Sequence, residues 1–289
     1  MRGILLAGGT GSRLWPLTTS VSKQLIPVYD KPMIYYPLTT LILAGVRSIA
    51  LITTSESQWQ FKKLLGDGSH LGLSIEFFIQ DEPRGISDAL LVSESFIAGE
   101  QVAMILGDNL FYGPGFGSSL KRVAGSEGAT VFGYRVSNPS DYGVVVLDKH
   151  GRAIDLVEKP EGFLSNIALP GLYFLDSSAV SRARELKVSA RGELEIVDLL
   201  RSYLRDELLS VELMPRGSAW LDTGTFDAMA EASEYVRTVQ KRQGQIVGSP
   251  EEAAWRQGLI SDSNLASLAD PLRKSGYGKY LLDLLEDKA

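Results

Sequence analysis

The chain has 289 residues, of which 44% are hydrophobic and 22% are charged, and its formal net charge is −6 at pH 7. A chain of this length can bury a large core, and the acidic balance argues against a general nucleic-acid-binding protein, which would carry a basic face. Cysteine is absent, which excludes disulfides, zinc–thiolate sites and thiol nucleophiles, and the two histidines lack metal-binding spacing. No apolar run approaches the ~20 residues of a membrane span and no signal peptide is visible, so we expect a cytoplasmic protein with no membrane and no nucleic-acid partner.

The first half of the chain alternates strand-like and helix-like segments. Nearly continuous apolar runs predict strands at 3–8, 48–54, 74–80 and 101–108, with helices between them at 31–45, 57–68 and 86–96. Continuous hydrophobicity is typical of strands that are covered on both faces. The alternation therefore predicts a mostly parallel sheet with helices on each side.

From about residue 128 the pattern changes to successive strands, predicted at 128–136, 142–148, 153–160 and 168–176. Such a series favours antiparallel strands added to the sheet, which could form a lid. Helices are predicted at 177–186, 193–206 and 225–244, strands near 208–222, and a wholly helical segment at 250–289. The predicted fold class is α/β, with a mixed, mostly parallel central sheet flanked by helices and a small C-terminal helical appendage.

The stretch LLAGGTGSRLWPLT, at 5–18, places three glycines and an arginine directly after the first predicted strand. Two common glycine loops do not fit, because Leu14 stands where a dinucleotide-binding loop needs its third glycine and no Gly-Lys-Ser/Thr of an ATPase loop occurs. A glycine-rich turn still exposes backbone N–H groups that favour anions, and Arg13 and Lys23 add cations nearby. The loop indicates either a phosphate-binding site or a structural turn with two solvated cations.

The motifs around this loop resemble those of the sugar-1-phosphate nucleotidylyltransferase family. LAGGTGSRLWPLT is followed by SKQLIPVYDKPMIYYPL, and then, in the family's order, by GDNLFYG at 107–113, EKP at 158–160, SARGELEIVD at 189–198 and AWLDTG at 219–224. The resemblance covers nearly the whole chain and points in particular to the branch that uses dTTP and glucose 1-phosphate. It implies a Rossmann-like nucleotidyltransferase fold, a Mg²⁺ cofactor, and attack by a sugar-phosphate oxygen on the α-phosphorus of a nucleoside triphosphate with release of pyrophosphate.

The resemblance assigns the reacting centre to four residues. Arg13 would hold the β- and γ-phosphates, and Lys23 would lie near the α-phosphate, where negative charge builds up. Asp108 and Asp222 would hold Mg²⁺, which one or two carboxylates typically bind together with substrate phosphates and water. Taken alone, an aspartate at a strand end is more often a turn-former than a metal ligand.

The resemblance also implies residues around each substrate. The nucleotide-binding set is Leu6, Gly8, Gly9, Thr10, Gly11, Gln24, Gln80, Pro83 and Gly85. The sugar-phosphate-binding set is Tyr142, Gly143, Glu158, Lys159, Gly171 and Arg191. Glu158 would accept hydrogen bonds from sugar hydroxyls and Lys159 would bind the sugar phosphate. By residue type alone Arg191 could equally be a surface arginine at a helix entry, and Trp220 is expected to be core.

Several positions depart from the family pattern. In QDEPRGISDAL, at 80–90, Ile86, Ser87 and Asp88 stand where the family has Leu, Ala and Gln, so that an acceptor-only carboxylate replaces an amide. Val146 and Ile167 stand where the branch tends to have Glu and Tyr. Three hypotheses follow: thymidylyl transfer to glucose 1-phosphate, the same chemistry with UTP or another hexose 1-phosphate, or an inactive nucleotide-sugar-binding regulator. The complete set of cations and carboxylates argues against the third.

We expect residues 1–240 to form the catalytic domain, with a nucleotide-binding part at 1–130 and a sugar-phosphate-binding part at 131–240, and residues 241–289 to form the appendage. The resemblance also implies a homotetramer with a regulatory nucleotide site between subunits, near 111–115, 215–220, Glu252 and Arg256. The apolar pattern of YLLDLLE, at 280–286, fits either a subunit interface or packing on its own domain.

Overall fold

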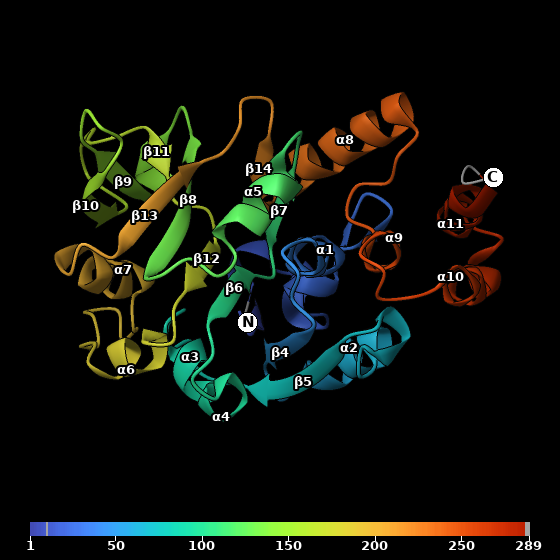
Figure 1. Ribbon diagram of the computed structural model, residues 1–289, viewed down its shortest axis with the longest axis horizontal. Helices are drawn as coiled ribbons and strands as arrows, with labels where there is room; N and C mark the ends of the chain where they lie inside the picture. The colour runs from blue at the N-terminus through green and yellow to red at the C-terminus, as the bar shows by residue number, and fades with distance from the viewer. Residues whose placement is uncertain (10, 287–289) are drawn as a thin grey trace.

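A ten-stranded mixed sheet forms the centre of the molecule (Figure 1). The computed structural model describes residues 1–9 and 11–286. The strands of this sheet are β1 (Arg2–Ala7), β4 (Ser48–Thr53), β5 (Ser74–Ile79), β6 (Val102–Leu106), β8 (Ala129–Arg135), β9 (Gly143–Leu147), β10 (Ala153–Glu158), β11 (Ile167–Ala168), β12 (Leu172–Leu175) and β13 (Leu209–Leu213). Their spatial order is β10-β9-β11-β8-β12-β6-β1-β4-β5, with β13 paired to β8 beside this path. The predicted α/β class is confirmed.

The strands β6, β1, β4 and β5 are parallel, and β12 runs antiparallel to both β6 and β8. The strands β9, β10 and β11 are antiparallel to their neighbours, as the second half of the sequence predicts. The strand β13 differs, because it pairs parallel with β8 after a helical connection. A parallel pairing requires such a crossover, and the sequence pattern, which predicts antiparallel strands for 128–176, leaves the direction of β13 open.

Helices cover both faces of the sheet (Figure 1). The helices of the described residues are α1 (Tyr35–Leu43), α2 (Gln58–Leu65), α3 (Asp88–Val92), α4 (Glu94–Ile97), α5 (Phe116–Val123), α6 (Ala179–Arg184), α7 (Ile196–Arg205), α8 (Phe226–Gln243), α9 (Pro250–Arg256), α10 (Asp262–Ala269) and α11 (Gly276–Glu286), of which the last three form the C-terminal end of the molecule. Successive residues of β1 point to opposite faces, so Leu5 packs with α1, α2 and α5 while Ile4 packs with α3, α6 and α7. Burial on both faces explains the continuous apolar runs. Within the described residues, no helix combines the length and apolarity that a membrane crossing requires.

Several expected helices are shorter than the sequence pattern predicts. The helix expected at 31–45 begins at Tyr35, because β3 (Lys31–Pro32) pairs with β2 (Pro27–Val28). The helix expected at 86–96 divides at Ser93 into α3 and α4. The helix expected at 225–244 is confirmed, since the Thr225 side chain caps its first turn and Gly244 ends it at φ 68°. The boundary expected at 240 falls inside α8, and the division into domains stays a prediction.

The C-terminal helices α9, α10 and α11 lie at one end of the molecule, and β9, β10 and β13 lie toward the other (Figure 1). The predicted appendage is thus present as three helices, of which α9 packs on α1. Between these ends, the carboxyl ends of β1 and β6 lie side by side, because the two strands are parallel and Leu6 pairs with Leu106. The glycine loop after β1 and the acidic segment after β6 therefore begin at the same edge of the sheet, where α/β sheets bind ligands.

Candidate active site

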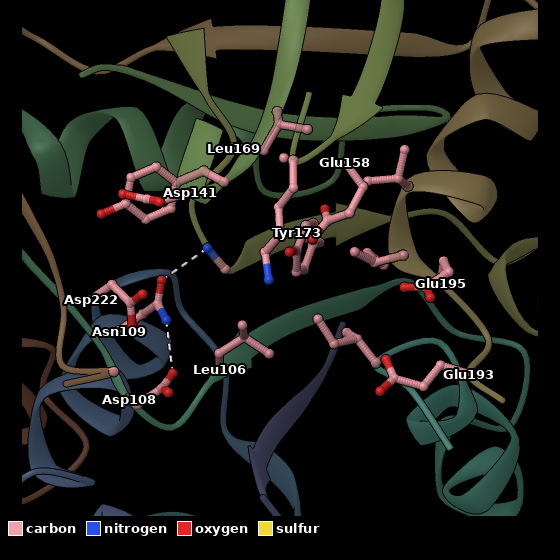
Figure 2. A pocket seen from close by; sticks show the side chains of 18 of the residues that line it. Leu106, Asp108, Asn109, Asp141, Glu158, Leu169, Tyr173, Glu193, Glu195 and Asp222 are labelled. Carbon is pink, nitrogen blue, oxygen red and sulfur yellow. Dashed lines mark hydrogen bonds between the residues drawn. The ribbon is translucent and has the colours of Figure 1, made fainter. Parts of the chain in front are cut away.

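A cleft of about 240 Å³ opens at this edge, between the parallel half of the sheet and the strands β8 to β12. All ten residues that the sequence assigns to catalysis and to the sugar phosphate line it: Arg13, Lys23, Asp108, Tyr142, Gly143, Glu158, Lys159, Gly171, Arg191 and Asp222. In Figure 2, Asp108, Asn109 and Asp222 lie together on one side of the cleft, and Glu193 and Glu195 lie on the opposite side. The fold thus brings together residues from distant parts of the chain.

The glycine loop leads into short 3₁₀ turns at Ser12–Leu14 and Lys23–Leu25 and not into a long helix. Gly11 has φ 61°, and an added Cβ there would lie 2.9 Å from Cγ2 of Thr18 and 3.2 Å from Cβ of Lys23. The Thr18 hydroxyl donates to the Gly11 carbonyl oxygen at 2.8 Å. Gly11 therefore permits both a left-handed backbone and a close approach to the segment that carries Lys23.

Lys23 is almost fully buried, and its Nζ lies 2.5 Å from Oδ2 of Asp108. Asp108 follows β6, and Asp222 ends β14 (Ala219–Asp222), which pairs antiparallel with β7 (Asn109–Tyr112). In this ladder Asp222 is opposite Asn109, which places the two carboxylates beside each other. Arg13 approaches the same point, since its guanidinium lies 3.6 Å from where a Cβ of Gly224 would be.

The two aspartates influence each other electrostatically. Burial raises the pKa of Asp222 to about 6, and the nearby carboxylate of Asp108 adds to this increase. The cations of Lys23 and Arg13 and the backbone N–H of Gly224 act in the opposite direction. A partly buried pair of neighbouring carboxylates is a donor set that suits a divalent cation. Within residues 1–9 and 11–286, no group of three or more His, Cys, Asp or Glu side chains forms a metal-binding cluster.

Asn109, which the sequence analysis did not single out, connects the walls of the cleft. Its Nδ2 donates to Oδ1 of Asp108 at 2.9 Å, and its Oδ1 accepts from Nε1 of Trp220 at 2.7 Å and from the backbone N–H of Gly171 at 2.9 Å. Trp220 is buried, as expected, yet it also lines the cleft. The available signal was the position of Asn109 in the GDN motif directly after Asp108.

The sugar side of the cleft depends on a close approach between two strands. Gly143 of β9 pairs with Glu158 of β10, and a Cβ on Gly143 would lie only 2.9 Å from Oε2 of Glu158. Burial raises the pKa of Glu158, and the neighbouring ammonium of Lys159 opposes that shift. Lys159 has φ 43°, a conformation that lets it leave the strand direction and line the cleft together with Glu158. The Tyr142 ring packs edge-on against the Trp220 ring at this wall of the cleft, with ring centroids 5.0 Å apart.

Arg191 lines the cleft and is paired with Glu195. Its Nε and Nη2 atoms donate to Oε1 and Oε2 of Glu195 at 3.1 and 2.7 Å, and the carboxylate also accepts from the Ser189 hydroxyl. The hydrogen bonds to Glu195 raise the pKa of Arg191. The arginine is therefore held over the cleft and not extended into solvent, and it remains about half exposed.

None of the described residues of the nucleotide set is among those that line this cleft. Gly9 is exposed and an added Cβ would meet nothing within 4 Å, whereas Gly8 lies against Gln80. Leu6 is partly exposed at the end of β1, Gln24 is buried with its Oε1 bound by the Ser22 hydroxyl, and Thr10 lies outside the described residues.

The segment 80–90, which carries Gln80, Pro83 and Gly85, is hydrogen-bonded to Leu194, which lies between the cleft-lining residues Glu193 and Glu195. Gly85, at φ 96°, packs against the backbone of Leu194, and Leu194 N–H donates to the Arg84 carbonyl at 2.8 Å. Pro83 is exposed. Asp88 is only 3% exposed, and its Oδ2 accepts from Nε2 of Gln80 at 2.8 Å. The carboxylate that departs from the family pattern thus lies behind the glutamine.

Of the remaining departures, Ile86 lines the cleft, Ser87 is buried, and Val146 and Ile167 lie away from the cleft. Val146 pairs with Asp155 in the β9–β10 ladder, and Ile167 pairs with Arg135 between β11 and β8. Neither side chain is among the residues that line the cleft.

Comparison with known proteins agrees with this geometry. Residues 2–239 match the Nucleotidyl transferase family. The chain is 54% identical over 286 residues to a glucose-1-phosphate thymidylyltransferase of Mycobacterium tuberculosis H37Rv, with 99% of both chains covered, and 52% identical over 287 residues to one of Neisseria meningitidis.

Solved structures give the same result. A crystal structure of a glucose-1-phosphate thymidylyltransferase from Bacillus anthracis, in complex with sucrose, has a TM-score of 0.76 and 37% identity, and the match covers 82% of this chain and 95% of that one. A UDP-glucose pyrophosphorylase complexed with UDP-glucose has a TM-score of 0.72 and 25% identity, with 82% and 98% covered. The chain belongs to the nucleotidyl transferase family.

Proposed function

We propose that the protein is a glucose-1-phosphate thymidylyltransferase, which transfers a thymidylyl group from dTTP to α-D-glucose 1-phosphate and releases pyrophosphate. The observation that carries this proposal is the convergence of two cations, Arg13 and Lys23, and two carboxylates, Asp108 and Asp222, in one cleft. Relatives of that name match over 99% of the chain and support the choice of substrates.

Catalysis of this step consists of alignment and charge neutralisation, because the two substrates are polyanions that repel each other. The backbone N–H groups of Gly8, Gly9 and Gly11, with Thr10 beside them, would bind the triphosphate. Arg13 and Lys23 would neutralise the phosphates, and the low exposure of Lys23 strengthens its effect on charge that develops nearby. Leu6, Gln24, Gln80, Pro83 and Gly85 would complete the nucleoside site.

The sugar phosphate would lie along the opposite wall. Glu158 would accept hydrogen bonds from sugar hydroxyls, with Gly143 leaving room for the ring, and Gly171 and Tyr142 would bound the pocket. Lys159 and Arg191 would bind the phosphate, and Glu195 holds Arg191 over the cleft. The attacking oxygen belongs to the substrate, so no covalent enzyme intermediate is needed.

The residues present fit Mg²⁺. Asp108 and Asp222 offer oxygen ligands side by side, and a cation would offset both the burial of Asp222 and the repulsion from Asp108, which together raise the pKa of Asp222. Bound there, the ion would neutralise charge on the phosphates during transfer.

We propose further that the protein is a cytoplasmic homotetramer with a regulatory nucleotide site between subunits. The segments 111–115 and 215–220 meet through the β7–β14 ladder, where Tyr112 pairs with Ala219. Glu252 binds both Arg256 and the Tyr280 hydroxyl, which joins α9 to α11. Sedimentation equilibrium tests the assembly, and inhibition by dTDP-sugars that excess dTTP does not relieve tests the second site.

The activity is tested by incubating the protein with Mg²⁺, each nucleoside triphosphate in turn and a panel of hexose 1-phosphates, and measuring pyrophosphate release. We expect dTTP with glucose 1-phosphate to be the best pair and UTP to be the second-best nucleotide. If pyrophosphate is released only with a different pair, the type of reaction stands and the proposed substrates are wrong. No release with any pair would support a protein that binds nucleotide-sugars without turnover.

A further inference from the structure

Gln80 is held by two groups that can only accept hydrogen bonds. Its Nε2 donates to Oδ2 of Asp88 at 2.8 Å and to the carbonyl oxygen of Gly85 at 3.3 Å. A primary amide nitrogen has two hydrogens, so both donors of Gln80 are used within the protein. Asp88 is 3% exposed.

This arrangement determines which way the amide faces. In the reversed amide, Oε1 of Gln80 would stand against a carboxylate oxygen and a carbonyl oxygen, with no hydrogen between them. The orientation therefore follows from the chemistry of its two neighbours. An amide at position 88, which offers both donors and acceptors, would permit either orientation.

The segment that carries Asp88 is fixed in place. Leu194 N–H donates to the Arg84 carbonyl at 2.8 Å, and Ser87 N–H donates to the Leu194 carbonyl at 3.2 Å. The guanidinium of Arg84 lies 3.6 Å from Asp88 and supports its negative charge from the solvent side. Two backbone hydrogen bonds to Leu194 thus hold the segment, and Arg84 stabilises the charge of the carboxylate.

The other atom of the amide, Oε1, accepts no hydrogen bond from the described residues and faces the glycine loop. It lies 3.6 Å from where a Cβ of Gly8 would be. With both N–H groups occupied, Gln80 can offer a ligand on this side only an acceptor. Thymine and uracil carry a donor, the N3–H of the imide, on their pairing edge, whereas cytosine has an acceptor at N3.

We propose that Asp88 is a positioning residue that locks the Gln80 amide with its oxygen toward the base, and so selects pyrimidines with an N3–H over cytosine. The inference rests on the proposed function, in which Gln80 contacts the base. It assigns to the carboxylate a role behind the glutamine and not a direct contact with the nucleotide.

The test is the ratio of kcat/KM for dTTP to that for dCTP, with glucose 1-phosphate as acceptor, in the wild type and in Asp88→Asn. The asparagine can pair with either orientation of Gln80, so we expect the ratio to fall roughly tenfold while kcat with dTTP is retained. The ratio of dTTP to dUTP should not change, because both bases carry N3–H. Where turnover of dCTP is too slow, its inhibition constant against dTTP replaces it, and Asp88→Ala serves as a second variant should Asp88→Asn not fold.

The matched control is Asp81→Asn, the same change on an exposed carboxylate of the same segment that binds the backbone of Ser55. It should leave the dTTP to dCTP ratio as in the wild type. A purely structural role of Asp88 would lower activity with dTTP and dCTP equally and leave the ratio unchanged, and that result overturns the inference.

A separate variant distinguishes failure of the inference from failure of the proposed function. Gln80→Ala should raise the KM for dTTP; if it does so while Asp88→Asn leaves the ratio intact, only the role of Asp88 is wrong. An unchanged KM in Gln80→Ala would remove Gln80 from the base site, and with it the inference. Absence of turnover by the wild type with every nucleotide would reject the proposed activity itself.

Discussion

The ammonium of Lys23 and the carboxylate of Asp108 form an ion pair of 2.5 Å that joins the loop after β1 to the end of β6. Lys23 is 7% exposed, so its charge depends on this partner and on Asp222 for compensation. The same pair places the cation proposed for the α-phosphate next to the carboxylate proposed for the metal. The first prediction follows from this contact.

Asp108→Asn should lower kcat by roughly 1,000-fold or more, because the amide is a weak ligand for a divalent cation. The melting temperature should change little, since loss of the charge next to Lys23 is offset by relief of the repulsion with Asp222. Pyrophosphate release and thermal unfolding measure the two effects. Asp283→Asn, on the exposed side of α11, is the control for the substitution. Near-normal activity in Asp108→Asn would remove the metal assignment.

Asp222 should make the metal-free protein less stable as the pH rises from about 4 to 6.5. Its folded-state pKa of about 6 lies above the ordinary value of 3.8, so the native state binds more protons than the unfolded state between these values. The free energy of unfolding therefore loses on the order of 1–2 kcal/mol over this window. Urea denaturation of the wild type and Asp222→Asn in EDTA isolates this contribution. A difference between the two proteins that does not vary with pH would contradict it.

Mg²⁺ should stabilise the protein more at pH 7.5 than at pH 5.5. A cation and a proton compete for the same carboxylate, and Asp222 is largely deprotonated only at the higher pH. The shift in melting temperature on adding Mg²⁺ at each pH measures this competition. In Asp222→Asn the shift should be small at both pH values. Equal shifts in the wild type at both pH values would show that Asp222 does not hold the ion.

Gly11→Ala and Gly9→Ala should differ in their effect on folding. At Gly11 an added Cβ meets Thr18 and Lys23 and the backbone has φ 61°, so we expect a loss of about 1–2 kcal/mol in the free energy of unfolding and a lower kcat. At Gly9 nothing lies within 4 Å, so stability should be retained while the KM for dTTP rises. Urea denaturation and initial rates separate the two outcomes. Retention of a normal KM in Gly9→Ala would show that the triphosphate does not approach this backbone.

Gly143→Ala should weaken sugar-phosphate binding selectively. The new methyl group would lie 2.9 Å from Oε2 of Glu158 and displace that carboxylate, so the KM for glucose 1-phosphate should rise roughly tenfold. The KM for dTTP should not change. Gly162→Ala, where an added Cβ meets nothing within 4 Å, controls for loss of a glycine in the neighbouring loop. Equal increases for both substrates would argue against a sugar-specific role of Glu158.

Much of the fold could be predicted because a strand that is buried on both faces needs a nearly continuous run of apolar residues. The strands β1, β4 and β6 are buried along most of their length, so their continuous apolar runs identify them without knowledge of their neighbours, whereas β5 at the sheet edge is partly exposed. The glycine loop and Asp108 could be placed at one edge by the same reasoning, since both directly follow parallel strands. The long helix α8 was visible from its cap and its terminating glycine.

Short elements and pairings could not be predicted in this way. The pairs β2–β3 and β7–β14 have two to four residues per strand, too few to show a period, and the parallel pairing of β13 depends on a partner far along the chain. The helix α5 has only eight residues and was not anticipated. In each case the deciding energy comes from contacts between segments distant in sequence, which local residue patterns do not record.

The sequence by itself determined which residue types are available to neutralise phosphates and where the strands that present them end. Only the tertiary structure decided which of them act together: the β7–β14 ladder places Asp222 beside Asp108, Asn109 ties that pair to the sugar side, and Asp88 lies behind Gln80 and not in front of it. The physical reason is that hydrogen bonds and charge interactions act over a few ångströms. Their partners are therefore set by how the strands and loops pack, and a single charged or polar side chain acquires its role from that packing.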